Sequence, residues 1–179
     1  NFESFKNHVS VLFWSLGNES YAGDILVEMN RYYKEKDPDR LVHYEGVAEN
    51  RPYEDLISDM ESQMYAPPEK IKEYLENNPK KPFILCEYMH DMGNSLGGME
   101  SYIRLLDQYE DYQGGFIWDY IDQALFVKDE VTGRDVLRYG GDFDDRPSDY
   151  EFSGNGILFA DRTEKPAMQE VRHYYGLRR

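Results

Sequence analysis

The sequence predicts an α/β protein, and more narrowly a part of a (β/α)8 TIM barrel. Short apolar segments of the length of a buried strand alternate with segments whose apolar residues recur at helical spacing. Strands that alternate with helices in this way are typical of parallel β/α units. The first strand is followed by GNES rather than by a glycine-rich phosphate-binding turn, which disfavours a dinucleotide-binding fold.

The expected strands are short and rich in branched or aromatic residues, as buried strands are. The first lies in VSVLFW and the fourth in PFILCE. The fifth follows a Gly-Gly pair, which we expect to break the chain before it. In order, the expected strands are Val9–Trp14, Leu41–Tyr44, Glu61–Tyr65, Pro82–Glu87 and Phe116–Tyr120.

Segments with helical spacing separate these strands. The first ends at a DPD turn, and the second begins at a Pro-Pro pair, because proline suits the first turn of a helix. A hairpin is expected over residues 126–139, around a Thr-Gly turn. The expected helices cover about residues 21–36, 69–77, 96–110 and 166–175.

Composition limits the classes of partner. The formal net charge is −15, which disfavours nucleic acids because phosphate recognition requires clustered Lys and Arg. No run of 18 apolar residues occurs, so no membrane span is expected. Aromatic residues make up 15% of the chain, which suits a sugar site but also an ordinary core. The cellular location is not predicted, because Asn1 does not resemble a native start and both ends look like cut ends.

Two carboxylates stand where a barrel keeps its catalytic groups, at the C-terminal ends of strands. Glu19 lies just beyond the first strand, in WSLGNES, and Glu87 ends the fourth, in ILCEY. A pair of carboxylates facing one cleft suits glycoside hydrolysis. The alternative is that both are solvated surface charges among 35 acidic residues. A glutamate that directly ends an apolar strand is less common, because burying a carboxylate without partners is unfavourable.

The segments around these carboxylates resemble glycoside hydrolase family 2, and specifically its β-galactosidases. WSLGNES and ILCEYMHDMGNSLGG resemble the two signature segments of the family, and SQMY, GGFIWDYIDQ, RYGGDF and NGILFADR extend the match in order. The family fold is an eight-stranded barrel flanked by β-sandwich domains. The resemblance places Val9–Trp14 at the fourth barrel strand, Phe83–Glu87 at the seventh and Phe116–Tyr120 at the eighth. Residues 1–179 would then be the C-terminal portion of the catalytic barrel domain, approximately strands four to eight, without the first strands and the sandwich domains.

The resemblance implies roles for the two carboxylates. Glu19 resembles the general acid/base of the family, and Glu87 resembles the nucleophile that forms a covalent galactosyl-enzyme intermediate. A retaining mechanism places two such carboxyl groups about 5–5.5 Å apart. Asn18, directly before the acid/base, resembles the residue that hydrogen-bonds the sugar 2-hydroxyl.

Three further residues resemble parts of the sugar site. Tyr65 resembles the tyrosine that hydrogen-bonds the nucleophile, and His90 resembles a histidine that contacts sugar hydroxyls in the transition state. Trp118 resembles the aromatic platform beneath the galactose. Taken alone, a Tyr or Trp at a strand end more often packs in a core, and a lone His is usually a loop residue. The motifs around them favour the site.

The resemblance also implies two metal ions. The backbone of Phe152 and the side chain of Asn155 resemble ligands of a sodium ion near the sugar 6-hydroxyl, which makes Asn155 a substrate-site residue as well. Glu19 resembles a magnesium ligand. The other magnesium ligands of the family would lie before Asn1, so the magnesium site would be incomplete in this chain.

The leading hypothesis is a retaining β-galactosidase that acts on a β-galactoside such as lactose and works as a homo-oligomer. Within the family, β-glucuronidase and β-mannosidase are alternatives. A glucuronidase needs a basic group for the substrate carboxylate, and the sequence of these loops does not indicate one. An alternative of another class is a non-catalytic carbohydrate-binding or structural fragment. Open strand edges at Val9–Trp14 and Phe116–Tyr120 predict that the isolated 179-residue chain is a poor hydrolase.

Overall fold

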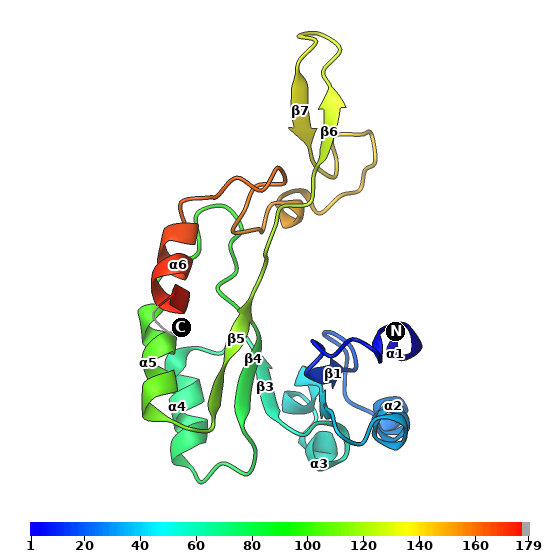
Figure 1. Cartoon of the computed structure of the whole chain (residues 1–179), viewed down its shortest axis with the longest axis vertical. Helices are drawn as coiled ribbons and strands as arrows, with labels where there is room; N and C mark the ends of the chain where they lie inside the picture. Colours follow the sequence, from blue (N-terminus) through cyan, green and yellow to red (C-terminus); the bar gives the residue numbers. More distant parts are fainter. Residues whose placement is uncertain (177–179) are drawn as a thin grey trace. The chain divides into compact units, whose positions relative to one another are not determined.

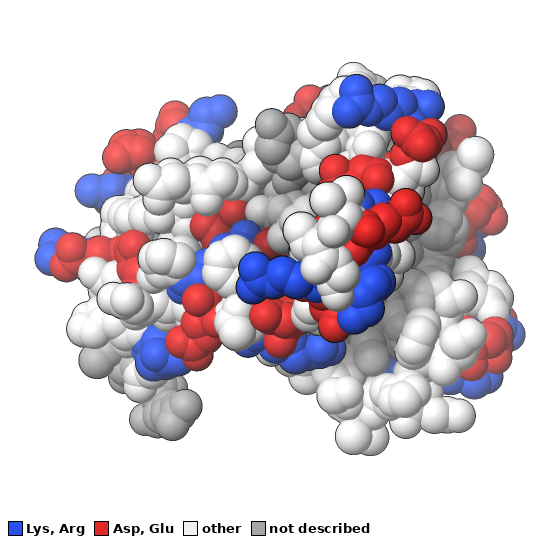
Figure 2. Space-filling view, turned by 90° about the horizontal axis from the view of Figure 1, so that it is seen from above, with Lys and Arg blue, Asp and Glu red and all other residues white. Residues whose placement is uncertain are grey.

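The computed structural model describes residues 1–176, whose helices and strands are labelled in Figure 1. The chain divides into two compact units. The first comprises residues 1–86 and 105–115, and the second comprises residues 87–104 and the residues from 116 onward. Within the described part of the chain, no helix is both long enough and apolar enough to cross a membrane. Acidic and basic side chains are interspersed over the face shown in Figure 2.

The strands follow one another in the sheets in the same order as in the sequence. β1 pairs with β2, and β3, β4 and β5 form a three-stranded sheet in that order. β1 and β2 are parallel, with Phe13 opposite Leu41 and Ser15 opposite His43. The strands are β1 (Phe13–Ser15), β2 (Leu41–His43), β3 (Glu61–Met64), β4 (Phe83–Tyr88) and β5 (Tyr112–Ile117).

Helices lie between successive strands, as the alternation in the sequence predicts. α2 connects β1 to β2, α4 connects β3 to β4, and α5 connects β4 to β5 (Figure 1). Short 3-10 turns and the small helix α3 connect β2 to β3. The helical elements are α1 (Phe2–Phe5), α2 (Asp24–Lys36), η1 (Glu45–Ala48), η2 (Arg51–Tyr53), α3 (Glu54–Ile57), α4 (Pro68–Glu76), α5 (Glu100–Gln108), η3 (Tyr150–Ser153) and α6 (Met168–Gly176).

An aromatic cluster forms part of the core of the first unit. The ring centroids of Phe2 and Trp14 lie 5.1 Å apart, and those of Trp14 and Tyr33 lie 5.6 Å apart. The indole N–H of Trp14 donates to Oδ2 of Asp37 at 3.0 Å. That hydrogen bond, together with the Arg40 guanidinium, lowers the pKa of Asp37. The aromatic residues of this segment therefore build the core, and the aromatic content of the chain is not by itself a sign of a sugar site.

Helix α4 shows how the sequence pattern produces packing. Pro68 occupies the first turn, where a missing N–H costs no helical hydrogen bond. Ile71 and Leu75 are four residues apart, so they share one face, and both are buried. Lys72 and Glu76 are exposed and form an ion pair. The helix buries its apolar stripe and leaves its charges in solvent.

The first predicted strand is wrong in its bounds. We expect Val9–Trp14, but only Phe13–Ser15 forms a strand. Val9 and Leu12 are 92% and 77% exposed and precede the strand. A strand needs a partner for its N–H and C=O groups, and β2 offers three residues, each paired with one residue of β1.

The fifth predicted strand is also displaced. We expect Phe116–Tyr120 after a break at Gly114, but β5 runs over Tyr112–Ile117 and contains that glycine. Gly114 has a φ of +86°, a conformation that glycine adopts without steric cost, so the strand continues through this glycine and does not end there. Trp118 consequently stands after the strand end.

The predicted hairpin is confirmed in the second unit. β6 (Leu125–Lys128) and β7 (Asp135–Arg138) are antiparallel, with Leu125 opposite Arg138 and Lys128 opposite Asp135. In the loop, Gly133 has a φ of +67°, a left-handed conformation that glycine adopts without steric cost. The carboxylate of Asp129 accepts hydrogen bonds from both the backbone N–H and the hydroxyl of Thr132, each at 2.7 Å.

A buried histidine links three strands of the first unit. His43 on β2 places Nδ1 2.9 Å from the hydroxyl of Ser15 on β1 and Nε2 2.7 Å from the hydroxyl of Ser62 on β3. A neutral imidazole has one donor and one acceptor, and serine hydroxyls serve as either. Burial lowers the pKa of His43 to about 4, because the charged ring would be desolvated.

This depressed pKa predicts that acid destabilises the first unit. In the unfolded chain His43 takes up a proton below a pKa of about 6.5, while in the folded chain it stays neutral down to about 4. The free energy of unfolding should therefore fall as the pH is lowered from about 6.5 to 4, by at most about 1.4 kcal/mol per pH unit. Urea unfolding at several pH values should show that His43→Gln removes this slope and that the exposed His8→Gln does not. Equal slopes in both variants would contradict the prediction.

Candidate active site

Glu19 lies in a turn that follows β1 in the first unit. Its φ of +50° is left-handed, which is uncommon for a residue other than glycine. Its backbone N–H donates to Oε1 of Glu45 at 2.6 Å, and the N–H of Ser20 donates to the hydroxyl of Tyr44 at 3.2 Å. Residues directly after β2 therefore hold the turn in place. Asn18 precedes Glu19 and is exposed, and its carbonyl oxygen accepts a hydrogen bond from the Ser20 hydroxyl at 3.2 Å.

Glu19 and Tyr65 line one pocket of about 440 Å³ within the first unit. Tyr65 follows β3, has a φ of +53° and is 38% exposed. Glu45 and Lys70 also line the pocket, so it carries charges of both signs. The structure thus brings together two residues predicted from two different motifs, one after the first strand and one after the third.

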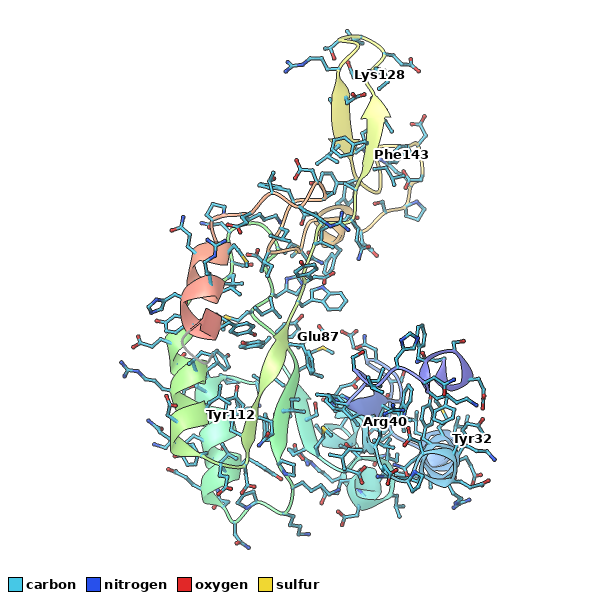
Figure 3. All side chains as sticks on the ribbon, viewed as in Figure 1. Tyr32, Arg40, Glu87, Tyr112, Lys128 and Phe143 are labelled. Carbon is cyan, nitrogen blue, oxygen red and sulfur yellow. The ribbon has the colours of Figure 1, made fainter. Side chains whose placement is uncertain are left out.

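Glu87 belongs to the second unit and lies near the end of β4, where Figure 3 labels it. Its side chain is half-buried. The next residue, Tyr88, is buried and anchors this strand end, because its hydroxyl lies 2.7 Å from that of Tyr175 on α6. The ring of Tyr88 also packs edge-on against Tyr102 of α5, with the ring centroids 5.5 Å apart. Glu87 therefore stands on a rigid part of the second unit.

The loop after β4 is tied to the residues after β5. The N–H of Trp118 donates to the carbonyl of Tyr88 at 3.0 Å, and the N–H of Asp91 donates to the carbonyl of Trp118 at 2.8 Å. His90 lies between these two bonds, and its ring meets that of Phe152 edge-on with 5.9 Å between centroids. Trp118 is 37% exposed and Phe152 is 58% exposed. Three predicted site residues of the second unit thus gather around one loop and keep aromatic surface open to solvent.

Asn155 carries an unsatisfied buried oxygen. Its side-chain N–H donates to the backbone carbonyl of Phe152 at 2.8 Å, and the backbone carbonyl of Asn155 accepts from the N–H of Asp119 at 2.8 Å. The residue is 4% exposed, and its Oδ1 has no hydrogen-bond partner among the described residues. A buried amide oxygen without a donor is suited to a hard cation such as sodium.

The predicted magnesium site at Glu19 has less support than the predicted sodium site. Within residues 1–176, no group of three or more His, Cys, Asp or Glu side chains is arranged to hold a metal ion. The predicted magnesium ligand Glu19 lies beside Glu45, which already accepts the Glu19 backbone N–H. The donor set that the described chain offers at Glu19 does not by itself fit magnesium.

The sequence interpretation missed the residues that hold Glu19. Tyr44 and Glu45 directly follow β2, in HYEG, at the same kind of strand end that singled out Glu19 and Glu87. Its position at a strand end therefore marks Glu45 as a candidate too. The hydrogen bond itself has no sequence signal, because no spacing marks a side chain that accepts the backbone N–H of a distant residue.

Comparison with protein families gives a match along nearly the whole chain. The family model described as "Glycosyl hydrolases family 2, TIM barrel domain" matches residues 1–178. Over 176 residues the chain is 74% identical to the "Beta-galactosidase large subunit" of Latilactobacillus sakei, covering 98% of this chain and 28% of the relative. It is 61% identical over 174 residues to a "Beta-galactosidase" of Halalkalibacterium halodurans, covering 97% of this chain and 17% of the relative. The chain thus spans well under a third of the length of these relatives.

Two solved structures are similar in fold. A β-galacturonidase from Eisenbergiella tayi, bound to galacturonate, superposes with a TM-score of 0.60 at 15% identity, covering 98% of this chain and 35% of the other. A β-glucuronidase from Faecalibacterium prausnitzii gives a TM-score of 0.60 at 20% identity, covering 98% of this chain and 33% of the other. At these identities the likeness concerns the fold alone.

Proposed function

Because the chain belongs to glycosyl hydrolase family 2, we propose that it is part of a larger enzyme that hydrolyses terminal β-D-galactosides with retention of configuration. The expected fold class is confirmed, since the family match is to a TIM barrel domain and the helices and strands alternate accordingly. The proposed substrate rests on the 74% identity to the large subunit of a β-galactosidase. The activity is assigned to the whole enzyme, because the chain spans 28% of that relative.

The proposed reaction has two steps that share one pair of carboxylates. In the first, the Glu87 carboxylate attacks the anomeric carbon while Glu19 gives its proton to the departing glycosidic oxygen, which leaves a galactosyl ester on Glu87. In the second, Glu19 takes a proton from water as that water attacks the anomeric carbon. The ester bond breaks, galactose leaves, and both side chains return to their starting protonation states.

The surrounding residues would bind and orient the sugar. The exposed face of Trp118 would lie beneath the apolar side of the galactose, and His90 and Asn18 would hydrogen-bond its hydroxyl groups. Tyr65 would donate to the nucleophile. The hydrogen bonds from Trp118 to Tyr88 and from Asp91 to Trp118 support this proposal, because they fix the platform and the His90 loop to one another.

The related β-glucuronidase activity is a second candidate. We expect no basic group from the sequence of the loops, but Lys70 of α4 lines the pocket that contains Glu19. A cation in this position could receive the carboxylate of a glucuronide. The same enzyme preparation should therefore be offered both sugars.

The nucleophile is testable by trapping. A 2-deoxy-2-fluoro galactoside should label Glu87 covalently, since the fluorine slows the second step more than the first, and peptide mass spectrometry locates the adduct. Glu87→Gln should abolish labelling, and Glu100→Gln, which changes an exposed carboxylate of α5, should not. Label on another residue would overturn the assignment. Label from the matching glucuronide but not from the galactoside would overturn the substrate.

The acid/base is testable by leaving group. Glu19→Gln should lower kcat/KM for galactosides with poor leaving groups by roughly 10²–10⁴-fold, because only these require the proton. Galactosides of acidic phenols should lose far less. Steady-state kinetics over a series of aryl galactosides measures this difference, and an equal loss across the whole series would contradict the role.

We also propose a sodium ion bound by Oδ1 of Asn155 and the carbonyl of Phe152. The ion would supply positive charge to a sugar hydroxyl. Asn155→Leu should abolish any rise of the melting midpoint in NaCl relative to choline chloride, whereas Asn155→Asp, which keeps an oxygen ligand, should retain it. A sodium-dependent shift of equal size in the leucine variant would contradict the site. Magnesium at Glu19 would need further ligands from the rest of the enzyme.

The enzyme is also proposed to work as an assembly of chains. Relatives at 68–74% identity are named large subunits, which implies a smaller subunit in those proteins. A homo-oligomer, predicted from the family resemblance, is the finer version of this proposal. The proposed substrate class is terminal β-galactosides, of which lactose is one example.

A further inference from the structure

The turn that carries Glu19 is held by three consecutive residues after β2, which we call the clamp: Tyr44, Glu45 and Gly46. We propose that the clamp is a positioning device for proton transfer, which sets where the Glu19 carboxyl stands relative to the leaving oxygen. The inference rests on the proposed function, since it deepens the role of Glu19 in that reaction. None of the three clamp residues touches the reacting atoms in the proposed mechanism.

Glu45 fixes the backbone of Glu19 directly. Its Oε1 lies 2.6 Å from the Glu19 nitrogen, and the residue is 7% exposed. A hydrogen bond from a backbone N–H to a buried carboxylate is stronger than one between neutral groups. It acts on the residue whose left-handed φ of +50° is unfavourable for a side chain other than glycine's. Glu45 therefore stabilises a conformation that the sequence alone would not favour.

Tyr44 fixes the next residue through both of its backbone groups. The Ser20 N–H donates to the Tyr44 hydroxyl at 3.2 Å, and the same hydroxyl donates to the Ser20 carbonyl. Tyr44 is fully buried, and its own N–H donates to the hydroxyl of Ser58 at 3.1 Å. The Tyr44 side chain is therefore fixed in the core, and its hydroxyl holds the backbone of Ser20 in place.

Gly46 lets the segment after β2 pass close to the Glu19 turn, because glycine has no side chain. A methyl group at this position would lie 2.3 Å from the Ser20 carbonyl oxygen and 2.6 Å from the Tyr44 ring. Both distances are far shorter than van der Waals contact. The segment after β2 and the Glu19 turn therefore approach one another more closely than any side chain would allow.

The chain contains a matched control for Tyr44. The hydroxyl of Tyr74, in α4, donates to the carbonyl of Lys81 at 2.9 Å and accepts from the N–H of Lys81 at 3.3 Å. This is the same pair of bonds to one residue's backbone, away from the Glu19 turn. Tyr44→Phe and Tyr74→Phe each remove two bonds to one backbone unit, but only the first releases Glu19.

The experiment is performed in the full-length enzyme and has two readouts. Melting midpoints report stability, and kcat/KM for a poor and an activated aryl galactoside reports proton transfer. Tyr44→Phe and Glu45→Ala should lower kcat/KM for the poor leaving group by roughly 10- to 100-fold, because a small displacement of a catalytic group is costly. The activated substrate should change by less than about threefold. Glu45→Gln, which keeps an oxygen acceptor, should recover most of the loss.

The controls decide between positioning and mere stability. Tyr74→Phe and the exposed Glu73→Ala should leave the ratio of the two kcat/KM values unchanged, whatever they do to the melting midpoint. Unchanged ratios in Tyr44→Phe and Glu45→Ala would overturn the proposal, and so would an equal loss in the Gln and Ala variants of Glu45. Absence of β-galactoside turnover in the unmodified enzyme is a separate outcome, which would instead overturn the proposed function.

Discussion

Left-handed backbone conformations in the segments that follow the strands are the constraint on which the candidate site depends. Glu19, Tyr65 and Met89 follow β1, β3 and β4, and their φ angles are +50°, +53° and +53°. Tyr65 and Met89 come directly after their strands, and Glu19 comes four residues after the end of β1. Glycine would adopt this conformation without strain, but glycine has no side chain to offer. A carboxylate or a phenol at such a position costs about 1 kcal/mol or more, which the surroundings must offset.

In the first unit, hydrogen bonds to Glu19 and Ser20 hold the left-handed turn. In the second unit, a buried ion pair holds the segment that carries Asn155. Lys165 Nζ lies 2.7 Å from Oδ1 of Asp122, with side chains 12% and 2% exposed. Desolvation of two charges is offset only when further hydrogen bonds satisfy them. Here the N–H of Gly156 donates to the same Asp122 oxygen, and Lys165 donates to the carbonyl of Gly154. The segment between these glycines carries Asn155, so the ion pair fixes the proposed sodium ligand.

The sequence predicts helix bounds well, because the spacing of apolar residues sets them. It predicts strand bounds poorly, because pairing with a neighbouring strand sets those. Helices α2 and α4 lie close to their expected bounds because their apolar stripes are regular. The first strand is three residues long because β2 offers three partners, and β5 includes Gly114 because a glycine adopts the φ of +86° found there without steric cost. Both errors come from judging a strand by its own residues, whereas its bounds are set by the neighbour.

The same distinction applies to the site. Strand-end position and motif predict Glu19 and Tyr65, and the structure places both in one pocket. The sequence does not predict the role of Glu45, because that role is a hydrogen bond to a backbone N–H 26 residues away, which no spacing of residues encodes. Likewise, the side-chain oxygen of Asn155 is found to lack a hydrogen-bond partner among the described residues only when its neighbours are placed.

The choice of sugar is a separate question from the fold. A β-galacturonidase and a β-glucuronidase, both named for sugars that carry a carboxylate, are similar to this chain in fold with TM-scores of 0.60 at 15% and 20% identity. Relatives at 74% and 61% identity are named β-galactosidases, so the fold alone does not determine the sugar. In barrels of this kind the loops after the strands make the site, and the scaffold beneath them serves stability. We therefore expect the residues that discriminate between sugars to lie in these loops, where the proposed site residues His90 and Asn155 stand, and not in the cores beneath. The 74% identity to the large subunit of a β-galactosidase is relevant to the sugar because it is measured over 98% of this chain, a span that takes in these loops, where a change of sugar would require a change of side chain.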